Sequence, residues 1–393
     1  MTVHTLFEAM PLWLAGDTPE GDAAVFSVCT LSRNLADMPF TARCSEAERA
    51  EVEERVLRAL DSLNILAGGT YFSLPGLTPC EVRLLAERKL ITRELAVAQG
   101  PRGVYVSEDQ TCAVMVNGAD HLTLRATVAG LQPQEAWSRL NLLDDTLAGV
   151  LDFAFDEDRG YATADFDGLG TGLRAAVLLH LPSRAQGRGN PAPAPGTEMD
   201  ARVEVHGVRA GGRDLTRQAA TERSSAEPGQ PWDMATQFMA EQAHYSDLNG
   251  PVACPPGETL GDLYLVSHRG GLGVSEQETV YRVRKAAESI VRGERATRET
   301  MARESRWYLE DRVGRARGLS AGVHLLTYSE ALAILSSIRL GVSMDLVPGH
   351  GVQEMNEMLL ACQGAHLEMA RGRRLDMFEL SRERAELFRA RFT

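Results

Sequence analysis

Asp120 and His121 are the first candidates for chemistry in this 393-residue chain, because they lie one residue past an Asn117-Gly118 pair. Asn-Gly between two alternating apolar runs is typical of a hairpin, so the sequence predicts two strands joined by a two-residue turn. Asp165 and Asp167 supply further oxygen ligands in a D-x-D spacing. These four side chains could bind a divalent metal ion, or Asp120 and His121 could satisfy hydrogen bonds beside the turn.

Apolar periodicity predicts the elements that would position these residues. Alternation predicts a strand meander over 103–128, with strands at 104–106, 112–116 and 121–127. Helical spacing and a Ser-Glu capping box predict a helix from residue 45. The apolar run 173–181 follows a glycine-rich loop and is ambiguous between a helix and a buried strand.

Charge and composition exclude several function classes. The chain carries a net charge of −13, and residues 281–393 hold 19 Arg and Lys against 15 Asp and Glu, so the rest carries −17. Such an acidic body argues against nucleic acid as a partner. No uncharged run is long enough for a membrane span. The N-terminus lacks the basic region of a signal peptide, and six scattered cysteines without C-x-x-C spacing favour a reducing cytoplasm.

Residues 183–256 interrupt this order with low-complexity Pro, Gly and Ser stretches such as NPAPAPG. Segments of this composition bury too little apolar surface to offset the entropy of ordering. We therefore expect a mobile insertion here, with its least ordered part at 186–230.

Several segments, in chain order, resemble the bacterial protein-arginine kinases (McsB-like), which are relatives of creatine and arginine kinases. The segments are LSRNLADMPF (31–40), AERKLIT (86–92), VNGADHL (116–122), GYATADFDGLGTGLRAAVLLHLP (160–182), GETLGDLYLVSHRGGLGVSE (257–276), LEDRV (309–313) and ELSRERAEL (379–387). The resemblance covers nearly the whole chain except 183–256.

The resemblance implies an α+β guanidino-kinase fold, with an antiparallel sheet flanked by helices and a helical C-terminal domain. It divides the chain into a kinase-like domain over 1–278 and a helical domain over 279–393, through which family members dimerise. It also implies transfer of the terminal phosphoryl group of ATP, with Mg²⁺, to an arginine of a protein. Such transfer depends on positioning and on neutralisation of charge by arginines.

This chain departs from the family pattern at most of the positions that carry the reaction. The two phosphate-binding arginines of the family's "SSRIRLARN" are Val28 and Thr30 here, and the histidine of "EKHLIS" is Lys89. In "NEEDHLRI" both glutamates are replaced, by Gly118 and Ala119. The arginine of that motif is replaced by Thr123, and "CPTN" becomes Asp165-Phe166-Asp167-Gly168.

Four residues remain as site candidates, and three of them match family residues. Arg33 and Arg174 match family arginines, Arg125 lies two residues after Thr123 on the same strand face, and Glu258 matches the acidic residue of "GTEALG". The resemblance implies that the arginines would bind the nucleotide and that Glu258 would be catalytic. In the C-terminal domain, the family's phosphoarginine-binding "RDIRRA" corresponds to Arg373–Phe378, with its charges rearranged.

Three functions follow as hypotheses. The first is a catalytically impaired pseudokinase that binds a protein partner and needs no cofactor. The second is an active, ATP- and Mg-dependent kinase acting on arginine-containing proteins, with a site rearranged around Arg125, Arg174 and Glu258. The third is a divalent-metal site at Asp120, His121, Asp165 and Asp167.

Overall fold

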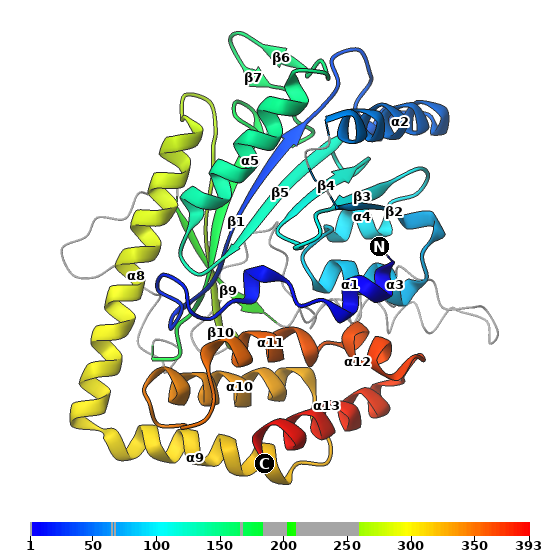
Figure 1. The fold of residues 1–393 in the computed structure, drawn as a ribbon. Coiled ribbons are helices and arrows are strands. Elements are labelled where there is room, and N and C mark those ends of the chain that lie inside the picture. Colours follow the sequence, from blue (N-terminus) through cyan, green and yellow to red (C-terminus); the bar gives the residue numbers. More distant parts are fainter. Residues whose placement is uncertain (1, 64–65, 67, 166–167, 184–202, 210–258) are drawn as a thin grey trace, which may run out of the picture. The chain divides into compact units, whose positions relative to one another are not determined.

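A computed structural model describes residues 2–63, 66, 68–165, 168–183, 203–209 and 259–393 (Figure 1). Its α-helices are α1 (Val3–Glu8), α2 (Glu46–Leu63), α3 (Pro79–Glu87), α4 (Arg93–Val97), α5 (Pro133–Ala148), α8 (Glu276–Glu304), α9 (Arg306–Gly322), α10 (Tyr328–Ser343), α11 (Val352–Ala361), α12 (Gly364–Arg371) and α13 (Met377–Phe392). Its strands are β1 (Ala24–Arg33), β2 (Thr70–Ser73), β3 (Gly103–Val106), β4 (Cys112–Val116), β5 (Leu122–Ala129), β6 (Phe155–Asp156), β7 (Gly160–Tyr161), β8 (Leu173–His180), β9 (Glu204–Arg209) and β10 (Thr259–Arg269).

The core is an eight-stranded sheet with the order β2-β3-β4-β5-β1-β8-β10-β9. The pairs β1–β5, β1–β8, β2–β3, β3–β4 and β4–β5 are antiparallel. Helices flank this sheet, and every described element from α8 onward is a helix. The predicted α+β class and the three predicted strands of the meander are therefore confirmed.

The structure decides one ambiguous segment, which is now β8, and differs from the expectation at another, which is now β9. The ambiguous run after the glycine-rich loop is strand β8, whose residues pair with β1 from Leu31 back to Ala24. Residues 204–209, expected within a mobile insertion, form strand β9 at the edge of the sheet. The expectation is wrong for β9, because β10 supplies its backbone partners. Residues 184–202 and 210–258 lie outside the described part of the chain.

The connection between β4 and β5 is longer than the predicted two-residue turn. Val116 pairs with Leu122, so residues 117–121 form the loop, and the Asn117 amide donates to the His121 carbonyl (2.9 Å). Asn117 has a left-handed backbone (φ 59°), which asparagine tolerates. Its side-chain Nδ2 donates to the carbonyls of Arg49 and Pro101. These tertiary bonds override the local Asn-Gly preference.

Helix α5 packs on one face of β1 and β5 (Figure 1). A buried ion pair connects β1 to this helix: Arg33 donates through Nε and Nη2 to the two carboxylate oxygens of Asp144 (2.9 and 2.6 Å). The Arg33 Nη1 donates to the carbonyls of Ser32 and Thr171, and the guanidinium lies over the Tyr161 ring, 3.5 Å from its centroid. Arg33 thus connects the central strand, a helix and the loop before β8.

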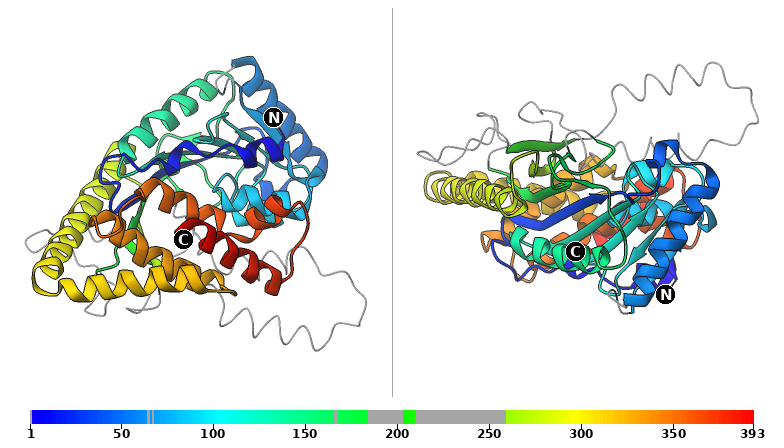
Figure 2. Two further views of the ribbon diagram at one scale, coloured as in Figure 1. Left: turned by 60° about the horizontal axis from the view of Figure 1, so that its bottom comes forward. Right: turned by 90° about the horizontal axis from the view of Figure 1, so that it is seen from above.

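The chain forms two compact units. The first contains the described residues of Met1–Leu179, Pro193–Val205 and Val266–Gly293, and the second contains those of His180–Ala192, His206–Leu265 and Glu294–Thr393. The division falls within α8, whereas the sequence places a domain boundary between residues 278 and 279. Within the second unit, α9 packs against α10 and α13, and α10 packs against α11 (Figure 2). None of the described helices has the length and apolarity that crossing a membrane requires.

A buried hydrogen-bond chain organises the second unit. The Ser336 hydroxyl donates to an Asp262 carboxylate oxygen (2.5 Å), so the His180 Nε2 must donate its proton to Ser336 (2.8 Å). Arg312 donates to the same Asp262 oxygen (2.9 Å). The other ring nitrogen of His180, Nδ1, has no hydrogen-bond partner among the described residues. Burial, and then the charges of Arg339, Arg298 and Arg312, lower the pKa of His180 well below 6.5.

The Arg33–Asp144 pair yields a stability prediction. Replacing Asp144 by Asn or Leu should lower the free energy of unfolding by about 3–5 kcal/mol, because it leaves a buried guanidinium without its anion. The double variant Arg33→Met/Asp144→Leu should recover most of that loss, since no buried charge remains. Urea denaturation measures both. In the control, Arg58→Met on α2 breaks an exposed pair with Glu54 and should change stability by about 0.5 kcal/mol or less. Equal effects of the buried and exposed pairs would contradict this account.

His180 yields a pH prediction. The native state holds this ring neutral, whereas the unfolded chain protonates it near pH 6.5. The stabilising contribution is therefore complete above pH 6.5 and decreases by up to about 1.4 kcal/mol per unit as the pH falls below it. Denaturation series at about pH 7.5 and about pH 5.5 should show a smaller acid loss in His180→Gln than in the unchanged chain. Gln keeps a donor toward Ser336, and an identical pH dependence of the two proteins would refute the assignment.

Candidate active site

The positions that match the family's phosphate-binding arginines lie on one face of the sheet. Thr30 of β1 is directly opposite Arg125 of β5 on one side and Arg174 of β8 on the other. Val28 is two residues before Thr30, and Thr123 is two residues before Arg125, so they share this face. The register therefore gathers the predicted site and sets two cations beside the neutral Thr30.

Arg125 does not extend freely from this face. Its Nη1 donates to the Lys89 backbone carbonyl (2.6 Å), and the side chain is buried. Desolvation by this burial lowers the pKa of Arg125 to about 10, and the nearby charge of Glu94 opposes the shift. Lys89, which stands where the family has a histidine, is buried with a left-handed backbone (φ 62°) just beyond the end of α3. The Arg125 bond thus stabilises a backbone turn that a non-glycine residue rarely adopts.

Arg174 lies at the start of β8, directly after the glycine-rich loop. The loop approaches β1 closely: Gly172 has φ 69°, and a Cβ there would lie 2.7 Å from the Ser32 carbonyl oxygen. The Ser32 amide in turn donates to the Gly172 carbonyl (3.1 Å). This contact fixes where Arg174 enters the face, with its side chain half-buried. Arg174 is therefore a half-buried cation directly opposite Thr30 on the predicted site face.

The other two candidates are placed differently. Arg33, expected to bind the nucleotide, has a side chain only 1% exposed and points to the opposite face, toward α5. Asp144, Ser32 and Thr171 already accept four of its hydrogen bonds. The structure thus gives Arg33 a structural role, and this corrects the expectation. Glu258, the expected catalytic residue, lies outside the described residues, directly before β10.

Asp120 and His121 are buried in a hydrogen-bond network beside the β4–β5 loop. The Asp120 carboxylate accepts from Asn34 Nδ2 and from the Ala164 amide, each at 2.7 Å. The His121 Nδ1 accepts from the Leu35 amide (3.0 Å), so its Nε2 carries the proton and donates to the Pro39 carbonyl (2.8 Å). Burial lowers the pKa of His121, which favours this neutral form. The two residues satisfy hydrogen bonds next to the loop, as one of the two interpretations expected.

The alternative of a metal site is not supported by these positions. Both ring nitrogens of His121 are occupied by backbone groups, so neither has a lone pair free for a metal ion. Asp165 is exposed and Asp167 lies outside the described residues. In the described part of the chain, no group of three or more His, Cys, Asp or Glu side chains could hold a metal.

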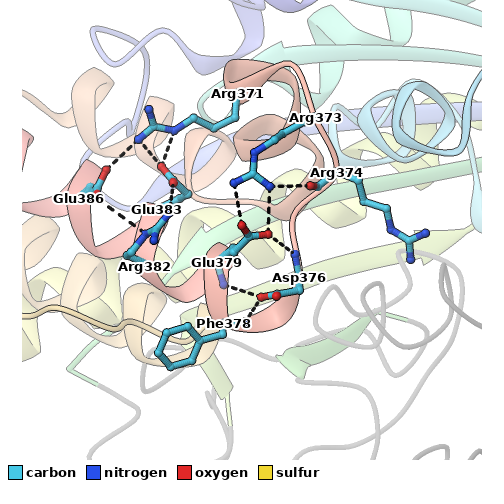
Figure 3. A network of polar contacts seen from close by, with 9 residues as sticks. All are labelled: Arg371, Arg373, Arg374, Asp376, Phe378, Glu379, Arg382, Glu383 and Glu386. Carbon is cyan, nitrogen blue, oxygen red and sulfur yellow. Dashed lines mark hydrogen bonds and ion pairs between the residues drawn. The ribbon is translucent and has the colours of Figure 1, made fainter.

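The C-terminal segment that matches the phosphoarginine-binding motif is closed by its own ion pairs (Figure 3). Arg373 donates to both carboxylate oxygens of Glu379 (2.7 and 3.1 Å), and this hydrogen bonding lowers the pKa of Glu379 to about 2. Asp376 caps α13 by accepting from the amides of Phe378 and Glu379. Arg373 therefore already has a carboxylate where an external anion would bind.

Sequence reasoning missed two residues that hold the site together. Asn34 connects Asp120 to β1, and its Oδ1 accepts from the His121 amide (2.9 Å). The sequence feature that could have identified Asn34 is its position directly after Arg33, in the matched segment LSRNLADMPF. Asp144, the partner of Arg33, carried no signal, because a carboxylate on an amphipathic helix usually faces solvent.

Comparisons with known proteins agree with the motifs. Residues 51–189 match the model of the ATP:guanido phosphotransferase C-terminal catalytic domain, and residues 306–393 match that of the protein-arginine kinase McsB C-terminal domain. Among solved structures, lombricine kinase is 18% identical, with a TM-score of 0.47 over 72% of this chain and 68% of that chain.

Full-length relatives extend the match. A protein-arginine kinase of Moorella thermoacetica is 31% identical over 380 residues, covering 96% of each chain. Another, of Symbiobacterium thermophilum, is 30% identical over 385 residues, covering 97% of this chain and 96% of its own. With this identity over almost the whole length, and with an antiparallel sheet flanked by helices and followed by a helical region, the chain belongs to the protein-arginine kinase family and has its guanidino-kinase fold.

Proposed function

We propose that this family member is a pseudokinase that keeps the fold, does not transfer phosphoryl groups to arginine, and acts by binding a protein partner. The observation that carries the proposal is the charge of the site face. Val28, Thr30 and Thr123 are neutral at positions that match family arginines, and they lie together on the face formed by β1 and β5.

The energetic consequence of these neutral side chains is large. Transfer of a phosphoryl group depends on cations that neutralise the charge on its oxygens. Removing one such preorganised group typically lowers transition-state stabilisation by about 3–4 kcal/mol, or about a hundredfold to a thousandfold in rate. Three losses on one face, even if their effects do not add fully, approach the scale of a whole enzymatic acceleration.

Arg125 is a poor substitute for the missing arginine at Thr30, although the two positions are adjacent. Its guanidinium would have to leave the Lys89 carbonyl, which is 2.6 Å from Nη1. Leaving a buried carbonyl unpaired typically costs about 1–3 kcal/mol. Lys89 would also lose the bond that supports its left-handed backbone. Arg174 then remains as the matched cation of this face.

The described residues do not fit ATP with Mg²⁺. Besides the neutral phosphate positions, Gly118 and Ala119 replace the two glutamates that would orient the guanidinium and accept its proton. Exposed Asp165 adds a negative charge to a loop that would face the phosphates. We derive no catalytic step through this nucleotide.

The proposal includes the cytoplasm as the compartment and a protein as the partner. Cys29, Cys44, Cys80, Cys112 and Cys362 are free thiols, which suits the reducing cytoplasm. The partner is a protein, bound as a complex rather than modified, and self-association through the helical region is part of the proposal.

A second candidate is an active kinase with a rearranged site. It is favoured by one observation, the row in which Thr30 lies between Arg125 and Arg174. In this candidate the two arginines and Glu258 would provide the phosphate clamp and the carboxylate.

The first prediction from the pseudokinase proposal concerns activity. The purified chain with Mg-ATP should form no phosphoarginine on itself or on an arginine-rich protein, because the cations and carboxylates of the reaction are replaced. Mass spectrometry under conditions that avoid acid, which hydrolyses the phosphoramidate, measures this. If phosphoarginine forms and Arg174→Ala or Glu258→Ala abolishes it, the rearranged kinase replaces the pseudokinase. Activity that survives both changes would refute both assignments of the site.

The second prediction concerns nucleotide affinity. Calorimetric titration with Mg-ATP should give millimolar binding or none. The reason is that Val28 and Thr30 stand where the family has phosphate-binding arginines and cannot make those contacts. Arg174→Ala should then leave the titration unchanged, as should the control Arg58→Ala on α2. Micromolar binding that Arg174→Ala weakens would contradict the proposal and favour the active enzyme.

A further inference from the structure

The hairpin of β6 and β7 presents an exposed aromatic side chain on an aromatic support (Figure 1). Phe155 of β6 is 60% exposed and is directly opposite Tyr161 of β7. The two rings are in edge-on contact, with 5.1 Å between their centroids. Tyr161 in turn lies over the buried guanidinium of Arg33, whose charge Asp144 neutralises. Phe155 is therefore the outer, solvent-facing member of a stack that begins in the protein interior.

Backbone contacts hold this hairpin in place. The Tyr161 amide donates to the Gly170 carbonyl (2.8 Å), and the Ala162 amide donates to the Ala154 carbonyl (2.9 Å). Gly160 lies so close to the glycine-rich loop that a Cβ there would be 2.3 Å from the Gly170 oxygen. The exposed ring thus belongs to an ordered element, and a partner that binds an ordered surface does not have to offset the entropy of ordering it.

The charge around Phe155 is negative and is not compensated within the chain. Residues 150–161 contain four carboxylates and one cation, so their net charge is −3. These charged residues are Asp152, Asp156, Glu157, Asp158 and Arg159. All five are exposed, and none of them forms an ion pair with another described residue. Asp156 Oδ1 accepts from the amides of Asp158 and Arg159, which keeps the charged tip of the hairpin compact.

We infer that residues 155–161, which we call the acidic hairpin, form a docking surface for a basic segment of a partner protein, with an arginine or lysine side chain stacked on the Phe155 ring. This inference rests on the pseudokinase proposal and names the chemistry of its partner. The face of an aromatic ring attracts a cation, and a guanidinium can also stack on it as a plane. The uncompensated carboxylates complement further cations of the same segment.

The same observations disfavour other occupants. An anionic partner would be repelled by the net charge of −3. A purely apolar partner would desolvate the carboxylates beside Phe155 without supplying a cation to pair with them. A metal ion lacks ligands, since in the described part of the chain no group of three or more His, Cys, Asp or Glu side chains could hold one. A basic segment fits both the ring and the charge.

The test is fluorescence anisotropy of the full chain with a labelled synthetic peptide in which arginines alternate with serines. We expect saturable binding that weakens as salt is added, because ion pairs contribute. The matched lysine peptide should bind more weakly, since an ammonium cannot stack as a plane, and the matched glutamate peptide should not bind. The double variant Glu157→Lys/Asp158→Lys should weaken binding of the arginine peptide at least tenfold and allow the glutamate peptide to bind.

Position 155 distinguishes stacking of a cation from simple burial of apolar surface. Phe155→Leu keeps an apolar side chain but removes the aromatic face, so it should weaken binding of the arginine peptide by about threefold to tenfold. Phe155→Trp should preserve or strengthen binding, because the indole ring attracts cations best. Equal affinities of the Phe, Leu and Trp forms would overturn the inference.

Two matched controls change exposed residues elsewhere in the chain. Tyr281→Leu removes an aromatic ring that is 51% exposed on α8, and Glu299→Lys/Glu304→Lys reverses two exposed carboxylates on the same helix. Both should leave binding unchanged, and circular dichroism should show that all variants fold. Absent binding, or equal loss in controls and hairpin variants, would overturn the inference, the latter in favour of general attraction to an acidic chain. Dimerisation that the hairpin variants abolish, without peptide binding, would overturn it in favour of a second copy.

The outcome separates from that of the pseudokinase proposal. Anisotropy is measured without ATP, so it reports on the acidic hairpin alone. Phosphoarginine formation by a chain whose peptide binding depends on Phe155 would refute the pseudokinase and leave the acidic hairpin in place. An inactive chain that binds no basic peptide would refute only the acidic hairpin.

Discussion

The buried pair of Arg33 and Asp144 is the constraint on which the kinase-like unit depends. The Arg33 guanidinium fixes the central strand to α5 and donates to the Thr171 carbonyl in the loop that leads into β8. A buried ion pair of this kind is stabilising only while both partners and their hydrogen bonds are present. It therefore also fixes the β1–β8 register, and with it the row in which Thr30 lies between two arginines.

Around this framework, Val28, Thr30 and Thr123 stand at positions that match family arginines. The hydrogen bonds of Asn34 with Asp120 and with the His121 amide connect the end of β1 to the β4–β5 loop. Three of the side chains on the face that would meet a nucleotide, those of Val28, Thr30 and Thr123, are neutral, and Arg125 bonds to the Lys89 backbone carbonyl. Packing constrains one face of the sheet, and the reaction constrains the other. Residues of the second face can therefore differ from the family while the fold remains.

Much of this could be predicted from the sequence, and the failures have physical reasons. Alternation over 103–128 predicted three strands, because their apolar residues follow the strand period. The run at β8 could not be assigned, since a strand buried on both faces has no period of its own. The two-residue turn failed because Asn117 bonds to distant carbonyls, and the role of Arg33 failed because its partner Asp144 is 111 residues away.

The bond from Arg125 to the Lys89 carbonyl has a consequence for reversibility. Changing Thr30 back to the family's arginine would place a third cation between Arg125 and Arg174, on directly opposed strand positions. Like charges so placed repel each other, and Arg125 cannot withdraw without releasing a strained backbone turn. An arginine at position 30 would thus lie beside Arg125, whose guanidinium is held at the Lys89 carbonyl. We therefore expect that Thr30→Arg alone does not restore the charge arrangement of the family.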